Sequence, residues 1–62
     1  MNGFVQFDGT TSSIPTTLSN ANLKIVCTSD SNVNAWVSFS SVWSINVSDS
    51  SFVGTVYYIV NF

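Results

Sequence analysis

Residues 33–47 read Val-Asn-Ala-Trp-Val-Ser-Phe-Ser-Ser-Val-Trp-Ser-Ile-Asn-Val, and this stretch decides the fold. Seven of its eight odd-numbered positions are apolar, and five of its seven even-numbered positions are polar. Alternation with a period of two is typical of a β-strand that has one buried face and one more exposed face. The stretch therefore predicts β-structure.

The alternation keeps its phase across Ser40-Ser41, which limits how the stretch can turn. A two-residue hairpin loop would move the apolar side chains to the opposite face, so it is excluded. We favour a hairpin with a loop over Ser40–Val42, which pairs the residues Phe39 with Trp43, Val37 with Ile45, and Ala35 with Val47. The alternative is one long bent strand of roughly 50 Å at about 3.3 Å per residue, longer than strands usually are.

Further strands are expected on both sides of this stretch, at residues 2–7, 23–28 and 52–62. Asp8-Gly9 predicts a turn with positive φ, residues 16–22 predict a loop, and Ile14-Pro15 predicts extended backbone with Pro15 at an edge or in a connection. The strand over 52–62 is apolar on both faces, so we expect it to be the most buried, with Gly54 at a bulge or a close approach. The fold class predicted for the single domain 1–62 is all-β, a small antiparallel sandwich or open barrel of about five strands.

Two Ser-Asp-Ser turns, at residues 29–31 and 48–50, are 19 residues apart, and the apolar residues around them also align. We interpret this faint repeat as two hairpins closed by the same turn chemistry.

The composition predicts association with other chains. Only 6% of the 62 residues are charged, compared with about 25% in an ordinary globular chain. Cys27 is the only cysteine and there is no histidine, so neither an internal disulfide nor a zinc site can stabilise so small a domain. Lys24 and Pro15 are the only residues of the types that commonly block an exposed strand edge. We expect the partners to be copies of the chain or other subunits of an assembly.

Several function classes are not expected. One lysine and a net charge of -2 argue against binding to nucleic acid, and no apolar run approaches a membrane-spanning length. The N-terminus shows no signal-peptide pattern, so we expect cytoplasmic synthesis. No histidine can activate Cys27, which we expect to be a buried, unreactive thiol, and the three aspartates lie in turn sequences where carboxylates cap the backbone. We therefore expect no catalytic residues, no metal site and no cofactor, and predict that the chain is not an enzyme.

Trp36 and Tyr57 are the candidate interface residues or ligand platform. Trp36 lies on the polar face of the central stretch, whereas Trp43 lies on the apolar face and is expected in the core. The favoured function is a structural subunit: a small coat, decoration or cement protein of a virus or phage particle, or of a similar shell or filament. The alternative is a carbohydrate- or protein-binding β module that uses exposed aromatic residues, with carbohydrate as a possible partner.

Overall fold

The computed structural model describes residues 1–30 and 32–61. Ser31, in the turn predicted at 29–32, and Phe62, in the strand predicted at 52–62, lie outside the described residues. The described chain forms six strands: β1 (Asn2–Asp8), β2 (Ser13–Pro15), β3 (Lys24–Ser29), β4 (Ala35–Phe39), β5 (Trp43–Val47) and β6 (Val53–Asn61).

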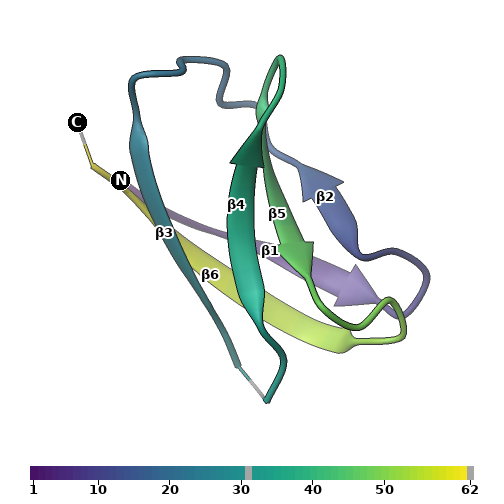
Figure 1. The fold of residues 1–62 in the computed structure, drawn as a ribbon. Helices are drawn as coiled ribbons and strands as arrows, with labels where there is room; N and C mark the ends of the chain where they lie inside the picture. Colours follow the sequence, from purple (N-terminus) through teal and green to yellow (C-terminus); the bar gives the residue numbers. More distant parts are fainter. Residues whose placement is uncertain (31, 62) are drawn as a thin grey trace.

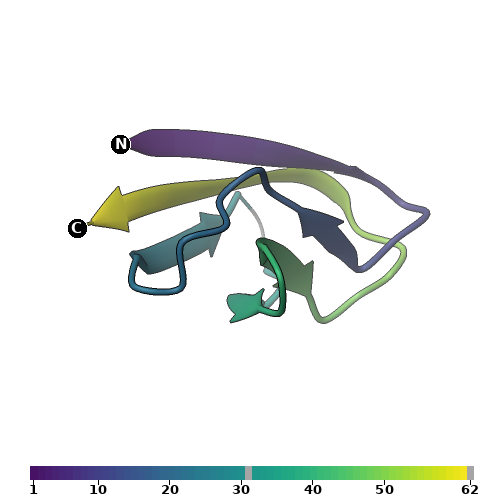
Figure 2. The same ribbon diagram turned by 90° about the horizontal axis from the view of Figure 1, so that it is seen from above.

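The strands form two antiparallel sheets of three strands each. Sheet A has the order β1-β6-β3 and sheet B the order β2-β5-β4, and the two sheets lie as two layers over a common core (Figures 1 and 2). This architecture confirms the predicted all-β sandwich or open barrel. The strand beyond the expected five is β2, where Ile14-Pro15 is extended as predicted and pairs with β5.

The central stretch is the hairpin β4–β5, with the predicted register. Phe39 lies opposite Trp43, Val37 opposite Ile45, and Ala35 opposite Val47. The N–H of Ser40 donates to the carbonyl of Val42 at 3.2 Å, so the loop is tight and odd-numbered. The alternative of one long bent strand is wrong.

The two Ser-Asp-Ser turns do not close hairpins. The first segment begins at Ser29, the last residue of β3 in sheet A, and the next strand is β4 in sheet B. The second lies between β5 in sheet B and β6 in sheet A. In the second turn, Asp49 Oδ1 accepts from the N–H of Ser51 at 2.9 Å, so the bend is stabilised by residues that are close in sequence. Such chemistry specifies a change of direction but not the sheet that the next strand joins. The hairpin interpretation of the repeat is therefore wrong.

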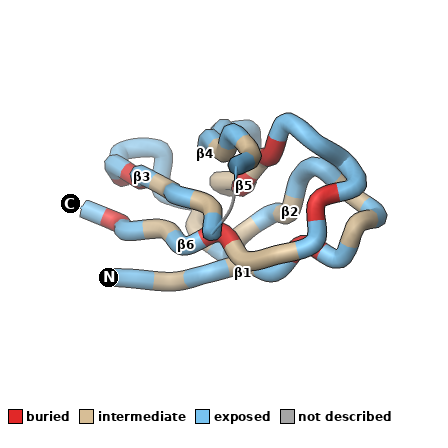
Figure 3. The backbone as a smooth tube through the Cα atoms, turned by 90° about the horizontal axis from the view of Figure 1, so that it is seen from below, coloured by how far each residue is buried: buried red, intermediate tan, exposed pale blue. Residues whose placement is uncertain are grey.

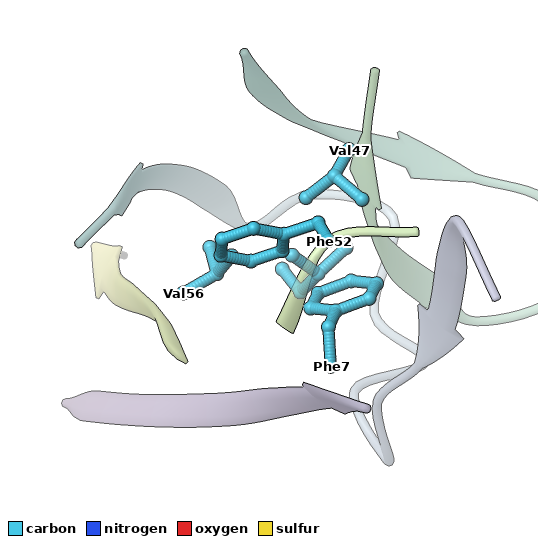
Figure 4. Packing of buried hydrophobic residues seen from close by; sticks show 5 residues of the cluster. Phe7, Val47, Phe52 and Val56 are labelled. Atoms are coloured by element: carbon cyan, nitrogen blue, oxygen red, sulfur yellow. The ribbon is translucent and has the colours of Figure 1, made fainter. Parts of the chain in front are cut away.

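The core lies between the layers and forms two neighbouring clusters. The larger contains Phe7, Ile45, Val47, Phe52 and Val56, and the smaller contains Leu23, Ile25 and Val60. Figure 4 shows side chains of the larger cluster from both sheets pointing toward one another. The buried residues are few and separated along the chain by exposed or half-buried ones (Figure 3), as expected where each strand buries one face.

The strand β6 is central in sheet A, but only one of its faces is buried. Val56 and Val60 are buried on the inner face, whereas Val53, Tyr57 and Ile59 are exposed on the outer face. The strand with no exposed residue is β5, so the expectation that 52–62 is most buried is wrong. Gly54 was expected at a bulge or a close backbone approach, but the atoms that crowd it belong to side chains: a Cβ there would lie 2.6 Å from Cζ of Phe52.

Candidate functional site

The outer face of sheet A carries a group of exposed apolar side chains, which we call the apolar face. Cross-strand pairing places Phe4 beside Tyr57 and Val26 beside Ile59. The aromatic rings of Phe4 and Tyr57 have centroids 6.5 Å apart. The members are 47–73% exposed and come from all three strands of the sheet: Phe4, Val26, Val53, Tyr57 and Ile59. Contiguous exposed apolar surface of this kind marks interaction sites in soluble proteins.

Charged residues lie at the ends of the apolar face. Asp8 is paired with Val53 at one end, and Lys24 is paired with Asn61 at the other. Asp30 belongs to the Asp8 end, because its Oδ2 accepts from the N–H of Thr55 at 3.1 Å. The apolar face therefore has an anionic end and a cationic end.

The outer face of sheet B, which we call the polar face, has a different composition. It surrounds the 48%-exposed side chain of Trp36 with short polar side chains, contributed by Ser13, Asn34, Ser38, Ser44 and Asn46. The Asn46 amide Nδ2 donates to the carbonyl of Trp36 at 3.3 Å and to Ser38 Oγ at 3.0 Å. The indole is thus an isolated aromatic surface in a hydrogen-bonding environment.

The structure does not bring Trp36 and Tyr57 together. Their strands belong to different sheets, and both side chains point away from the shared core. The two layers separate them, so they cannot form one aromatic platform. A role in binding stays a prediction for each residue separately.

Trp43 contacts the smaller core cluster and is half-buried. Its ring lies 5.1 Å from that of Phe39 between centroids, and its Nε1 donates to the carbonyl of Asn20 at 2.9 Å. The side chain therefore fastens the loop 16–22 to the hairpin. It is part of the core, as expected, although less completely covered.

Cys27 is half-buried beside the larger core cluster rather than fully buried. It lies on β3, an edge strand of sheet A, which has a neighbouring strand of that sheet on one side only. Burial still raises the pKa of the thiol, which lowers the fraction of reactive thiolate at neutral pH.

Asp8 and Asp49 cap turns in the same way, as predicted from their sequence context. Asp8 Oδ1 accepts from Thr10 Oγ1 at 2.5 Å and from the Thr10 N–H at 3.1 Å. Asp49 Oδ1 accepts from Ser51 Oγ at 2.7 Å and from the Ser51 N–H. These hydrogen bonds, those from the side-chain hydroxyls foremost, lower the pKa of each carboxyl.

Four residues of the apolar face were not singled out from the sequence, although a signal for them exists. Each lies at the alternate position of its strand, where an exposed face normally carries polar residues; they are Phe4, Val26, Val53 and Ile59. Alternation assigns residues to a face, but it does not show whether another layer covers that face.

Within residues 1–30 and 32–61, no cluster of histidine, cysteine or acidic side chains could hold a metal ion, and no pocket is enclosed. None of the described residues forms a helix that could cross a membrane. No protein-family model, curated protein or solved structure matches the chain.

Proposed function

We propose that this chain is a non-catalytic structural subunit that docks on its neighbours through the apolar face. The observation that carries this proposal is the exposure of Phe4, Tyr57 and Ile59 at the centre of one sheet, in a chain with four charged side chains. A soluble monomer normally keeps a charged, mixed surface, and an apolar face is covered when another chain packs on it.

The size of the molecule is compatible with this role. A broad side of 30 × 19 Å corresponds to a footprint of about 570 Å². Two such sides packed together remove at most about 1,100 Å² from water, slightly above the minimum of roughly 1,000 Å² for a specific interface.

The charges favour another copy of the chain as a neighbour. If two apolar faces pack with their strands antiparallel, Lys24 of one copy lies over the Asp8 and Asp30 end of the other. Such pairing at the rim contributes little affinity, but it selects the orientation.

Within this class, we favour a small coat, decoration or cement protein of a virus or phage particle, or of a similar shell or filament. A chain with one apolar face and one uncharged polar face can fill a repeated position in a shell, with one side against neighbours and the other side free. On this proposal the protein resides in the assembled particle.

Sedimentation or native mass measurement at micromolar concentration tests the proposal. We expect species larger than the 6.7 kDa of one chain. Ile59→Lys places a charge in the centre of the apolar face and should shift the distribution to the single chain. Ser38→Lys adds the same charge on the polar face and should leave the distribution unchanged. A folded wild-type chain that sediments only as a 6.7 kDa species would contradict the proposal.

One observation favours a carbohydrate-binding module as the second candidate. Trp36 presents an exposed indole beside the Asn46 amide and the Ser38 hydroxyl. An aromatic surface that packs on apolar C–H groups, next to side chains that can exchange hydrogen bonds with hydroxyls, is suited to a sugar ring.

A further inference from the structure

The strand β1 has a free hydrogen-bonding edge. Met1 and Val60 exchange both main-chain hydrogen bonds, at 3.1 Å and 2.7 Å, so they form a hydrogen-bonded pair of the β1–β6 ladder. Such pairs alternate along an antiparallel ladder, so Gly3, Val5 and Phe7 also direct their main-chain groups toward β6. The main-chain groups of Asn2, Phe4 and Gln6 point the other way, and they have no hydrogen-bond partner among the described residues.

Two other edge strands, β3 in sheet A and β2 in sheet B, carry residues that hinder pairing with a further strand, and β1 does not. The N–H of Thr16 donates to the carbonyl of Trp43, so the main-chain nitrogen of the preceding Pro15 faces away from β5, toward the free edge of β2. Because proline has no N–H, this edge lacks a donor at that position. Lys24 lies at the start of β3, which also packs beside β4. Over its seven residues, β1 has no lysine, proline or bulge, and it is the longest of the four edge strands. Figure 2 shows it as the outermost ribbon of its layer.

We propose that β1 pairs antiparallel with β1 of a second copy of this chain, about a two-fold axis at Val5. This inference rests on the proposed function, because it identifies the contact by which two subunits join. In this register Phe4 lies opposite the partner's Gln6, and Asn2 opposite the partner's Asp8, so every outward-facing residue of the strand is paired. The two sheets A become one sheet of six strands.

The register suits the side chains as well as the main chain. The two Asp8 carboxylates lie at opposite ends of the pairing, about 20 Å apart, so they do not repel each other strongly. The two Phe4 residues become diagonal neighbours at about 7–8 Å, within reach of aromatic contact. Each Phe4 also contacts the Tyr57 of its own chain, so the seam joins two aromatic pairs into one cluster.

A second copy fits this edge better than an unrelated strand, because a two-fold contact needs only one self-complementary surface. Pairing also makes the two apolar faces continuous. The joined face has a footprint of up to about 1,100 Å². The area buried when two such units pack face to face is therefore well above the minimum for a specific interface.

Amide hydrogen exchange of the wild-type chain, followed by NMR over a range of concentrations, tests the pairing directly. The amides of Phe4 and Gln6 should exchange rapidly in dilute solution and become at least ten-fold slower as the pair forms. The amide of Val5, already bonded to β6, should be slow throughout, and that of Val37, which faces the free edge of β4, should stay fast. Phe4 and Gln6 amides that remain fast in the associated protein would overturn the proposal.

Substitution at Gln6 separates the edge from the face. Gln6→Pro removes an outward N–H without breaking a bond to β6, and Gln6→Thr changes the side chain but keeps that N–H. Circular dichroism checks that the proline variant is folded. We expect the smallest associated species of this variant to have half the wild-type mass, and that of the threonine variant to have the wild-type mass. If Ile59→Lys dissociates the protein and Gln6→Pro does not, the edge pairing is overturned while the proposed function stands. A wild-type chain that is monomeric at every concentration would contradict both the edge pairing and the proposed function.

Discussion

At the scale of single residues, the turn at Asp8-Gly9 was predictable because its causes are local. Gly9 has a φ of 86°, in the region that residues with a Cβ rarely adopt, and Asp8 Oδ1 accepts from the Thr10 N–H two residues later. Both features depend only on neighbours in sequence, and the same holds for Asp49 and Ser51. The half-burial of Cys27 was not predictable, because the place of β3 at the edge of sheet A is set by long-range strand pairing.

The positive φ at Gly9 makes a specific prediction. Gly9→Ala should destabilise the fold by about 1–2 kcal/mol, since an alanine in this region brings its Cβ too close to the main chain. Gly9→Asn is the control, because asparagine tolerates this conformation better and its Cβ meets the same Val53 methyl group, 3.1 Å away. Urea unfolding measures both variants. Equal losses of unfolding free energy in the two variants would mean that crowding against Val53, and not the positive φ, is the reason for glycine at this position.

At the scale of elements, the hairpin was predictable and the connections between sheets were not. The phase of alternation across Ser40-Ser41 fixed the loop parity and hence the pairing of Val37 with Ile45. The destination of the strand after each Ser-Asp-Ser turn depends on long-range pairing, such as that of β3 with β6, which no local pattern contains. The apolar outer side of β6 was mistaken for a second buried side for the same reason.

The link between the hairpin and the loop 16–22 depends on Trp43. We expect Trp43→Ala to cost about 3 kcal/mol, the low end for removing an aromatic side chain from a core, since Trp43 is half-buried. Trp43→Phe retains a ring near Phe39 and loses mainly the 2.9 Å hydrogen bond to the carbonyl of Asn20. Because water can reach that carbonyl, we expect this variant to lose only about 1 kcal/mol of unfolding free energy. Urea unfolding distinguishes the two. Equal costs would show that the hydrogen bond, rather than packing, dominates.

At the scale of the whole molecule, the sandwich separates two surfaces of different chemistry. Tyr57 belongs to the apolar face and Trp36 to the polar face. The sequence placed each residue on the correct side of its own strand, but the relation between strands of different sheets follows only from the topology. A single aromatic platform was therefore plausible from the sequence and is absent from the fold.

This separation predicts that Trp36→Ala and Tyr57→Ala act independently. Their effects on the free energy of unfolding should add to within about 0.3–0.5 kcal/mol, as for distant sites. Phe4→Ala and Tyr57→Ala provide the contrasting pair, because these rings contact at 6.5 Å and should couple by about 0.5–1.5 kcal/mol. Urea unfolding at one fixed protein concentration measures both double-mutant cycles.

The same variants assign a role to each face. Tyr57→Ala should lower the mass of the associated species, because it removes part of the contact surface at the centre of the apolar face. Trp36→Ala should leave that mass unchanged, and it should abolish any oligosaccharide-induced change in tryptophan fluorescence if the polar face binds sugars. Loss of association in Trp36→Ala but not in Tyr57→Ala would reverse the assignment: sheet B would then be the surface that meets the neighbouring subunit, and the exposure of Phe4, Tyr57 and Ile59 would need another cause.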